Sequence, residues 1–293
     1  MKQWGVTLQK CNRDFEKVQS KVQLSLPLSC TESSALPLNG RAPIITGGSR
    51  GIGRAIALHF NSLGARLVIN YASNSTHADQ LVSLLNSSAA AGAADDGGLP
   101  QAIAIKADIS DEQQVKTLFD KAEAVFGSIQ ILVHSAGILD PKYPPIASTT
   151  VADWDETFSI NTKGAFLCCR AAINRFARGG RIIMISTSLV GGLQPGYGAY
   201  TASKAAVETM IKIAAKELKG RGVTANCVAP GPTATELFFQ GKSEETINRM
   251  VDLCPLGRLG QTHDLTPIVG LIASDAGEWI NGQVIRVNGG AIV

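Results

Sequence analysis

The sequence predicts an α/β fold, a doubly wound parallel sheet of about seven strands with helices on both faces. Short apolar runs alternate with segments of helical periodicity from residue 41 onward. Hydrophobic residues make up 45% of the 293 residues but aromatic residues only 5%, so small aliphatic side chains build the core. The 30 glycines suit the tight turns between strands and helices. These observations predict one domain at 41–293, preceded by an extension at 1–40.

The strands are predicted from apolar runs bounded by turn residues. They lie at 43–46, 66–71, 103–107, 129–134, 181–186, 223–228 and 284–287. Between them, helices are expected after a glycine-rich turn up to Gly64, around 79–85, from a capping box at Ser110 and Gln113 to Gly127, at 151–177 and at 198–219. A short helix is expected near 243–252, and the Ala/Gly/Ser/Asp-rich residues 86–98 are expected to form a surface loop. Parallel strands joined in this way place ligands at their carboxyl ends.

Composition excludes several classes of protein. The formal charge is +3 with no Lys/Arg block, which argues against nucleic acid as a partner. No apolar run approaches the ~18 residues that span a bilayer, so no membrane partner is expected. The six cysteines lack CxxC spacing, so we expect no metal and no disulfide scaffold, but buried free thiols.

The extension at 1–40 has five basic and three acidic residues and no apolar core of a secretory signal. A poorly ordered segment on a cytoplasmic protein is the favoured interpretation. The alternative is a transit peptide that directs the protein to a plastid, although such peptides are usually Arg-rich and poor in acids.

A glycine-rich turn, TGGSRGIG at 46–53, follows the first predicted strand. Glycines let the backbone approach a pyrophosphate closely, and the helix that follows offers free N–H groups to that anion. The position after the first strand favours a nucleotide site over a purely structural turn. The predicted contacts are Gly47, Ser49, Arg50, Gly51, Ile52 and Gly53.

The end of the second strand indicates which dinucleotide binds. NAD sites usually carry an acid there for the ribose 2′-hydroxyl, whereas this chain has Asn70, Tyr71, Ala72 and Ser73. Arg50 in the glycine turn adds a cation that can face a 2′-phosphate. The sequence therefore favours NADPH over NADH, the alternative being a solvent-exposed arginine without this role.

Tyr200 and Lys204 have the spacing that places two side chains on one face of a helix. A nearby ammonium stabilises the phenolate, so we expect Lys204 to lower the pKa of Tyr200 from ~10 towards neutrality. Such a tyrosine can act as the general acid in carbonyl reduction. By itself this pair is common by chance, and most such pairs are surface residues.

Two further polar residues support the pair. Ser188, with Ser186 close by, ends the fifth strand and can hydrogen-bond a substrate oxygen that gains negative charge. Asn161, on the helix after the fourth strand, can hold a water near Lys204 and relay protons. An isolated Ser or Asn would be interpreted as a helix cap.

The motifs together resemble the short-chain dehydrogenase/reductase superfamily, in the branch with a TGxxxGxG turn. The resemblance covers residues 41–290 and rests on TGGSRGIG (46–53), AD (107–108), SAG (135–137), Asn161, Ser188, YxxxK (200–204), PG (230–231) and NGQVIRVNGG (281–290). Stretches such as GYGAYTASKAAVETM look like plant NADPH-dependent aldehyde reductase-like proteins, which are related to fungal hydroxynaphthalene reductases.

This resemblance implies a Rossmann-type fold and a set of residue roles. Asn161, Ser188, Tyr200 and Lys204 would form the catalytic tetrad, with Ser188 preferred over Ser186 because Ser188-Leu-Val-Gly matches the family's S-x-x-G ending. Lys204 would also hold the nicotinamide ribose, and Tyr200 would lie beside it. The remaining implied cofactor contacts are Asp108 and Ile109 at the adenine, Ser135, Ala136 and Gly137 along the ribose, and Pro230, Gly231, Thr233 and Thr235 towards the nicotinamide.

Three positions depart from the family pattern. His134 stands where the family usually has Asn; we expect a neutral packing residue satisfied by backbone, with a perturbed water relay as the alternative. Pro43 removes a ladder hydrogen bond from a central strand, which is tolerable only if the strand starts there. Thr233 replaces a typical aliphatic residue near the nicotinamide.

The sequence thus predicts an NADPH-dependent reductase of a small aldehyde or ketone, in which the cofactor supplies the hydride. Alternatives are a cyclic or aromatic ketone reductase of specialised metabolism, an NADP-linked alcohol dehydrogenase, and a catalytically silent NADP-binding regulator. The substrate pocket is expected after strands four, five and six, where residues 235–258 with Leu237, Phe238 and Phe239 either cap it or staple a short helix. The resemblance also implies a homodimer or homotetramer formed through 151–177 and 198–219.

Overall fold

A computed structural model describes residues 36–87 and 99–293 of the chain. Seven parallel strands form one sheet in the order β3-β2-β1-β4-β5-β6-β7, which confirms the doubly wound fold. The strands are β1 (Pro43–Thr46), β2 (Leu67–Tyr71), β3 (Ala102–Lys106), β4 (Ile131–His134), β5 (Arg181–Ile185), β6 (Thr224–Pro230) and β7 (Val284–Val287). The order reverses between β1 and β4, and this reversal opens a crevice at their carboxyl ends.

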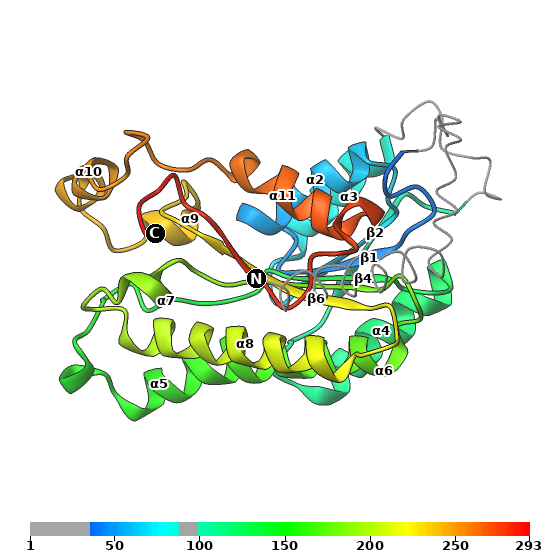
Figure 1. The fold of residues 1–293 in the computed structure, drawn as a ribbon, viewed down its shortest axis with the longest axis horizontal. Helices are drawn as coiled ribbons and strands as arrows, with labels where there is room; N and C mark the ends of the chain where they lie inside the picture. The colour runs from blue at the N-terminus through cyan, green and yellow to red at the C-terminus, as the bar shows by residue number, and fades with distance from the viewer. Residues whose placement is uncertain (1–35, 88–98) are drawn as a thin grey trace, which may run out of the picture. The chain divides into compact units, whose positions relative to one another are not determined.

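Helices cover both faces of the sheet (Figure 1). One layer holds α4 (Glu112–Phe126), α5 (Val151–Phe158), α6 (Gly164–Arg175) and α8 (Gly198–Glu217), and the other holds α2 (Gly51–Ser62), α3 (Ser75–Ser87) and α11 (Thr262–Ala273). The short helices α7 (Leu189–Gly192), α9 (Glu236–Phe239) and α10 (Glu244–Asp252) lie in the connections after β5 and β6. The 3₁₀ turns are η1 (Ile146–Ser148) and η3 (Asp275–Gly277), and η2 (Ser159–Lys163) is a π turn.

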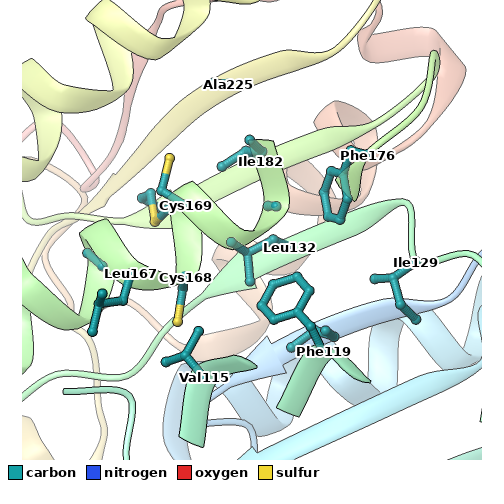
Figure 2. Close-up of a cluster of buried hydrophobic side chains, with 14 of the residues drawn as sticks. Val115, Phe119, Ile129, Leu132, Leu167, Cys168, Cys169, Phe176, Ile182 and Ala225 are labelled. Atoms are coloured by element: carbon teal, nitrogen blue, oxygen red, sulfur yellow. The ribbon is translucent and has the colours of Figure 1, made fainter. Parts of the chain in front are cut away.

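The core divides into one apolar layer on each face of the sheet, because residues of a buried parallel strand alternate between the two faces. Figure 2 shows the layer between the sheet and α4, α6 and α8, where Phe119, Leu132 and Ile182 pack beside Cys168 and Cys169. The four described cysteines are free and buried, as predicted, while Cys11 and Cys30 lie outside the described residues. Burial raises the pKa of Cys169 to about 12, so this thiol is inert at neutral pH.

The first strand begins at Pro43, as the sequence required for a proline in a central strand. Because the proline is the first residue of β1, its missing N–H falls at the end of the hydrogen-bond ladder and not within it. The packed fold begins a few residues before the predicted boundary at 41. Leu38 is fully buried, and its N–H donates to Leu63 O at 2.9 Å, so residues from Leu36 belong to the domain.

One predicted helix detail was wrong. The helix α4 is capped by Asp111, whose carboxylate accepts from Gln114 N at 2.9 Å, and not by Ser110. The helical region predicted at 151–177 is confirmed, because α5, the π turn η2 and α6 follow one another without a break from Val151 to Arg175. The surface loop predicted at 86–98 falls mostly outside the described residues. In the described part of the chain, no helix is both long and apolar enough to cross a membrane.

Candidate active site

A cavity of about 670 Å³ opens at the carboxyl ends of the strands. The residues predicted to bind a dinucleotide line it, with the exception of Gly53. These are Gly47, Ser49, Arg50, Gly51, Ile52, Asn70, Tyr71, Ala72, Ser73, Asp108, Ile109, Ser135, Ala136, Gly137, Tyr200, Lys204, Pro230, Gly231, Thr233 and Thr235. The predicted catalytic residue Ser188 lines the same cavity, whereas Asn161 lies buried behind it. Residues separated by almost two hundred positions in sequence therefore share one space.

The glycine turn between β1 and α2 is built so closely that only glycine fits. A Cβ on Gly53 would lie 2.4 Å from Gly47 O, and a Cβ on Gly47 would lie 2.8 Å from the Cα of Ala136. Gly53 thus lets α2 begin directly against the turn, which is why it supports the cavity without lining it. No side chain caps α2, so its first N–H groups are left for an anion such as a pyrophosphate.

The end of β2 carries no acid, as the sequence showed. Asn70 is buried, and its amide donates to Ala107 O at 3.0 Å and Ile105 O at 3.3 Å, so the side chain fixes the end of β3. Arg50 is mostly exposed and forms an ion pair with Glu236 at 3.4 Å across the cavity mouth. An exposed pair of this kind contributes little stability, which leaves the guanidinium free to exchange partners.

Tyr200 and Lys204 lie one turn apart on α8, with the ammonium 6.0 Å from the centre of the phenol ring. Lys204 is buried and donates to Ile185 O at 2.9 Å. The expectation that Lys204 lowers the pKa of Tyr200 was wrong. Desolvation by burial is the largest effect on both groups, and it raises the pKa of Tyr200 to about 12 and lowers that of Lys204 to about 8.

Three hydroxyl residues follow β5 and differ in their partners. Ser186 donates to Glu208 Oε1 at 2.6 Å, so its hydroxyl is engaged inside the fold. Thr187 hydrogen-bonds the phenol of Tyr200, which lowers the pKa of that phenol slightly against the effect of burial. Ser188 lines the cavity as the residue before α7, with its N–H bound to Pro230 O at 2.8 Å. Sequence reasoning missed Thr187, whose contact with Tyr200 depends on how β5 meets α8.

Asn161 sits in the π turn η2 between α5 and α6. Its side chain bonds the backbone of Ile138 in both directions, accepting from N at 2.8 Å and donating to O at 2.9 Å. A further bond, donated to Ser203 Oγ at 3.1 Å, ties η2 to α8. A π turn inserts an extra residue and is frequent at functional sites. Here it places the Asn161 amide in line with the loop after β4, beside Gly137 and Lys204.

Comparison with known proteins agrees with this geometry. The sequence model of a family described as enoyl-(acyl carrier protein) reductase matches residues 47–291. The chain is a short-chain dehydrogenase/reductase. It is therefore an oxidoreductase, and the resemblance predicted from its motifs is confirmed.

Several relatives of this short-chain dehydrogenase/reductase have names that describe an activity. An NADPH-dependent aldehyde reductase-like protein, chloroplastic, of Arabidopsis thaliana is 56% identical over 260 residues, covering 88% of this chain and 96% of the relative. NADPH-dependent aldehyde reductase 2, chloroplastic, of the same plant is 52% identical, covering 90% and 98%. Among solved structures, a short-chain dehydrogenase of Burkholderia cenocepacia in complex with NADP is 30% identical with a TM-score of 0.79, covering 87% of this chain and 99% of its own.

His134 is a buried polar residue of this reductase at the end of β4. Its Nδ1 lies 3.0 Å from Thr46 Oγ1, and its Nε2 has no hydrogen-bond partner among the described residues. The expectation that backbone would satisfy this side chain was therefore wrong. Burial, reinforced by the charge of Lys204, lowers the pKa of His134 to about 3, so the ring is neutral at physiological pH.

The other predicted residues are held by short local bonds. Asp108 accepts from the N–H and the hydroxyl of Ser110 at 2.9 and 2.8 Å, which fixes its carboxylate at the cavity wall. The hydroxyl of Thr233, the departure noted from the sequence, donates to Gly231 O at 2.9 Å, so it is engaged by the neighbouring backbone. Leu237 and Phe238 line the cavity, whereas Phe239 does not. Of the two predicted alternatives for this segment, a cap on the pocket therefore agrees better with the structure than a staple for the short helix.

The structure adds three residues that sequence reasoning missed. Tyr143, in the loop after β4, has a φ of +50°, which is rare for a residue with a side chain. Its ring lies 5.0 Å from that of Tyr197, and its hydroxyl donates to Gln240 O at 2.7 Å. Lys242 lies against both rings and lines the cavity with Tyr197. The only sequence signal was the proline-rich loop at 141–145, since the contacts join segments about a hundred residues apart.

Proposed function

We propose that this protein is an NADPH-dependent reductase that converts a small aldehyde or ketone to the alcohol. One observation carries the proposal: a single cavity holds the uncapped N-terminus of α2 after its glycine turn and, at another part of its wall, the Tyr200 and Lys204 pair. Relatives named as NADPH-dependent aldehyde reductases support the choice of substrate class and cofactor. The absence of an acid at the end of β2, with Arg50 nearby, favours the 2′-phosphate of NADPH.

The chain's own residues divide the work. When bound, NADPH supplies the hydride that adds to the carbonyl carbon and is left as NADP⁺. Tyr200 donates its proton to the carbonyl oxygen, which completes the alcohol. Ser188 holds that oxygen as it gains negative charge, and Thr187 orients the phenol. Lys204 would hold the ribose hydroxyls of the cofactor.

In this proposal the pKa of Tyr200 depends on which group the Lys204 ammonium binds. With the ammonium on Ile185 O, the phenol keeps its proton and is a weak acid. An ammonium that binds the ribose close to Tyr200 stabilises the phenolate, and this brings the phenol pKa towards the working pH. Asn161, whose amide binds the backbone of Ile138 and the hydroxyl of Ser203, holds the loop after β4 beside Lys204.

The test is the consumption of NADPH, followed by absorbance, with a panel of aldehydes, ketones and quinones. Tyr200→Phe should lose nearly all turnover and keep its affinity for NADPH, measured by the cofactor's fluorescence, because the ring still packs in place. A variant that retains most of its activity contradicts the assignment of the acid. The reverse assay, with alcohols and NADP⁺, distinguishes a reductase from an NADP-linked alcohol dehydrogenase. Binding of NADPH without turnover on any compound would identify a silent NADP-binding regulator.

A homo-oligomer and a plastid location form part of the proposal. Exposed apolar side chains on the outer helices, Trp154 on α5, Phe166 on α6 and Ile213 on α8, support association of copies through this layer. Light scattering of the purified protein measures the mass. Two relatives named as chloroplastic favour the plastid, the alternative to the predicted cytoplasmic location. Most of the segment considered as a transit peptide lies outside the described residues. Fractionation of cells that express the full chain with a C-terminal tag decides the location.

A further inference from the structure

Lys242 is a half-buried cation in the wall of the cavity. Its ammonium lies 4.4 Å from the centre of the Tyr143 ring, 4.7 Å from that of Phe238 and 5.8 Å from that of Tyr197. Three aromatic faces thus surround one positive charge, an arrangement that holds an ammonium in place. Tyr143 and Tyr197 come from the loops after β4 and β5, Phe238 comes from α9, and Lys242 follows α9.

The hydrogen bonds of Lys242 leave its charge uncompensated. It donates to Tyr143 Oη at 2.5 Å and to Phe238 O at 2.6 Å, and both of these acceptors are neutral. No carboxylate forms an ion pair with Lys242 in the part of the chain that the structure describes. An ammonium has three donors, so one N–H remains for a ligand. Burial without a counter-charge lowers its pKa to about 8, which still leaves it protonated at neutral pH.

The surroundings of this charge narrow the class of ligand. Neither acid that lines the cavity pairs with Lys242: Asp108 accepts from Ser110, and Glu236 lies 3.4 Å from Arg50. The same cavity is also lined by apolar side chains, among them Leu189, Leu237, Phe238, Met250, Leu253 and Ile292. Half-buried charges in proteins are normally paired, so an unpaired one that faces a pocket indicates an anionic ligand. One ammonium acts as a point charge and compensates a single negative charge, which matches a carboxylate better than a doubly charged phosphate.

Taken together with the proposed reductase function, on which this inference rests, we propose that Lys242 binds a carboxylate on the substrate. The substrate class is then an aldehyde or ketone with an apolar body and a carboxylate at the end away from the carbonyl. Tyr143, Tyr197 and Phe238 form an aromatic cage that holds the ammonium of Lys242 in position. The strained backbone of Tyr143 keeps its ring in this cage. Lys242 is a specificity-determining residue, and the chemistry at Tyr200 does not require it.

The test compares two aldehydes of the same shape, 4-formylbenzoate and 4-methylbenzaldehyde, by their kcat/KM values. In the wild type the charged aldehyde is expected to be preferred at low ionic strength, and the preference is expected to fall as salt is added. Lys242→Met keeps the stem of the side chain and removes the charge, so the ratio of the two values should fall about tenfold or more. Lys242→Arg should keep a substantial part of the ratio. Lys142→Met, an exposed lysine of the same loop as Tyr143 that does not line the cavity, is the matched control and should leave the ratio unchanged.

A second variant distinguishes recognition of the substrate's charge from a purely structural role of the hydrogen bonds that Tyr143 makes with Lys242 and Gln240. Tyr143→Phe removes the hydroxyl that joins Lys242 and Gln240 but keeps the ammonium. If only these hydrogen bonds matter, Tyr143→Phe and Lys242→Met lower the kcat/KM values for the charged and the neutral aldehyde equally, and the proposal is overturned. Binding gives a readout independent of turnover: 4-methylbenzoate should raise the melting temperature of the NADP⁺-loaded wild type and not that of Lys242→Met. A wild type that reduces only the neutral aldehyde overturns the carboxylate proposal and leaves the reductase function intact, whereas no turnover of either aldehyde or of the wider panel overturns the reductase function.

Discussion

The buried imidazole of His134 makes this protein sensitive to mild acid in a way that can be calculated. The unfolded chain protonates this histidine near its ordinary pKa of 6.5, whereas burial lowers the folded pKa to about 3. Between these values the unfolded state binds a proton that the folded state does not bind, so stability is complete above pH 6.5 and falls as the pH falls. Each pH unit below 6.5 costs about 1.4 kcal/mol, so at about pH 4.5 the loss from His134 alone is about 3 kcal/mol.

The measurement is the free energy of unfolding in urea at several pH values between about 7 and 4.5, for the wild type and for His134→Asn. Carboxylates also titrate in this range, but they are common to both proteins and cancel in the difference. The wild type should lose about 3 kcal/mol more than His134→Asn across the range. His77→Asn, at an exposed histidine on α3, is the control and should follow the wild type. Parallel curves for the wild type and His134→Asn would refute the reasoning, because they would mean that the folded protein accepts the proton at this site.

Three further outcomes test the cavity. Gly53→Ala places a methyl group 2.4 Å from Gly47 O, so it should lower the free energy of unfolding by about 1–3 kcal/mol and weaken NADPH binding. Gly127→Ala, at a position with open space and a φ of +72°, is the control. It should lower the free energy of unfolding in urea by about 1–2 kcal/mol without affecting the affinity for NADPH. Arg50→Ala should raise the KM for NADPH about tenfold and leave that for NADH nearly unchanged, as steady-state kinetics with both cofactors will show. Thr187→Val should lower kcat and shift its pH profile, whereas Thr187→Ser should restore both.

The fold and most of the cofactor site could be predicted because their signals are local. A glycine turn after a strand, or a Tyr and a Lys one helical turn apart, is defined by a few neighbouring residues, and parallel strands bring such segments to one edge. The environment of the same residues could not be predicted. Proximity of Lys204 and Tyr200 suggested a lowered phenol pKa, but the outcome depends on how deeply both groups are buried, and burial is a property of the whole fold.

The substrate end of the cavity was the least predictable part for a related reason. The cage around Lys242 joins Tyr143, Tyr197 and Phe238, which come from three separate connections. No periodicity or spacing links such segments, and the positive φ of Tyr143 follows no rule for tyrosine. The π turn that holds Asn161 is similar, because its extra residue leaves the apolar pattern of 151–177 almost unchanged.

The order of the strands determines when the cofactor site comes into existence during synthesis. The glycine turn after β1 emerges from the ribosome early, but the opposite wall of the cavity includes Pro230, Gly231 and Ile292 near the end of the chain. A nascent chain that has completed β1 to α8 therefore contains both its phosphate-binding turn and Tyr200. It still lacks the residues that close the cavity around them. Because a ligand stabilises only the state that binds it, NADPH contributes nothing to the early stages of folding and protects only the finished protein.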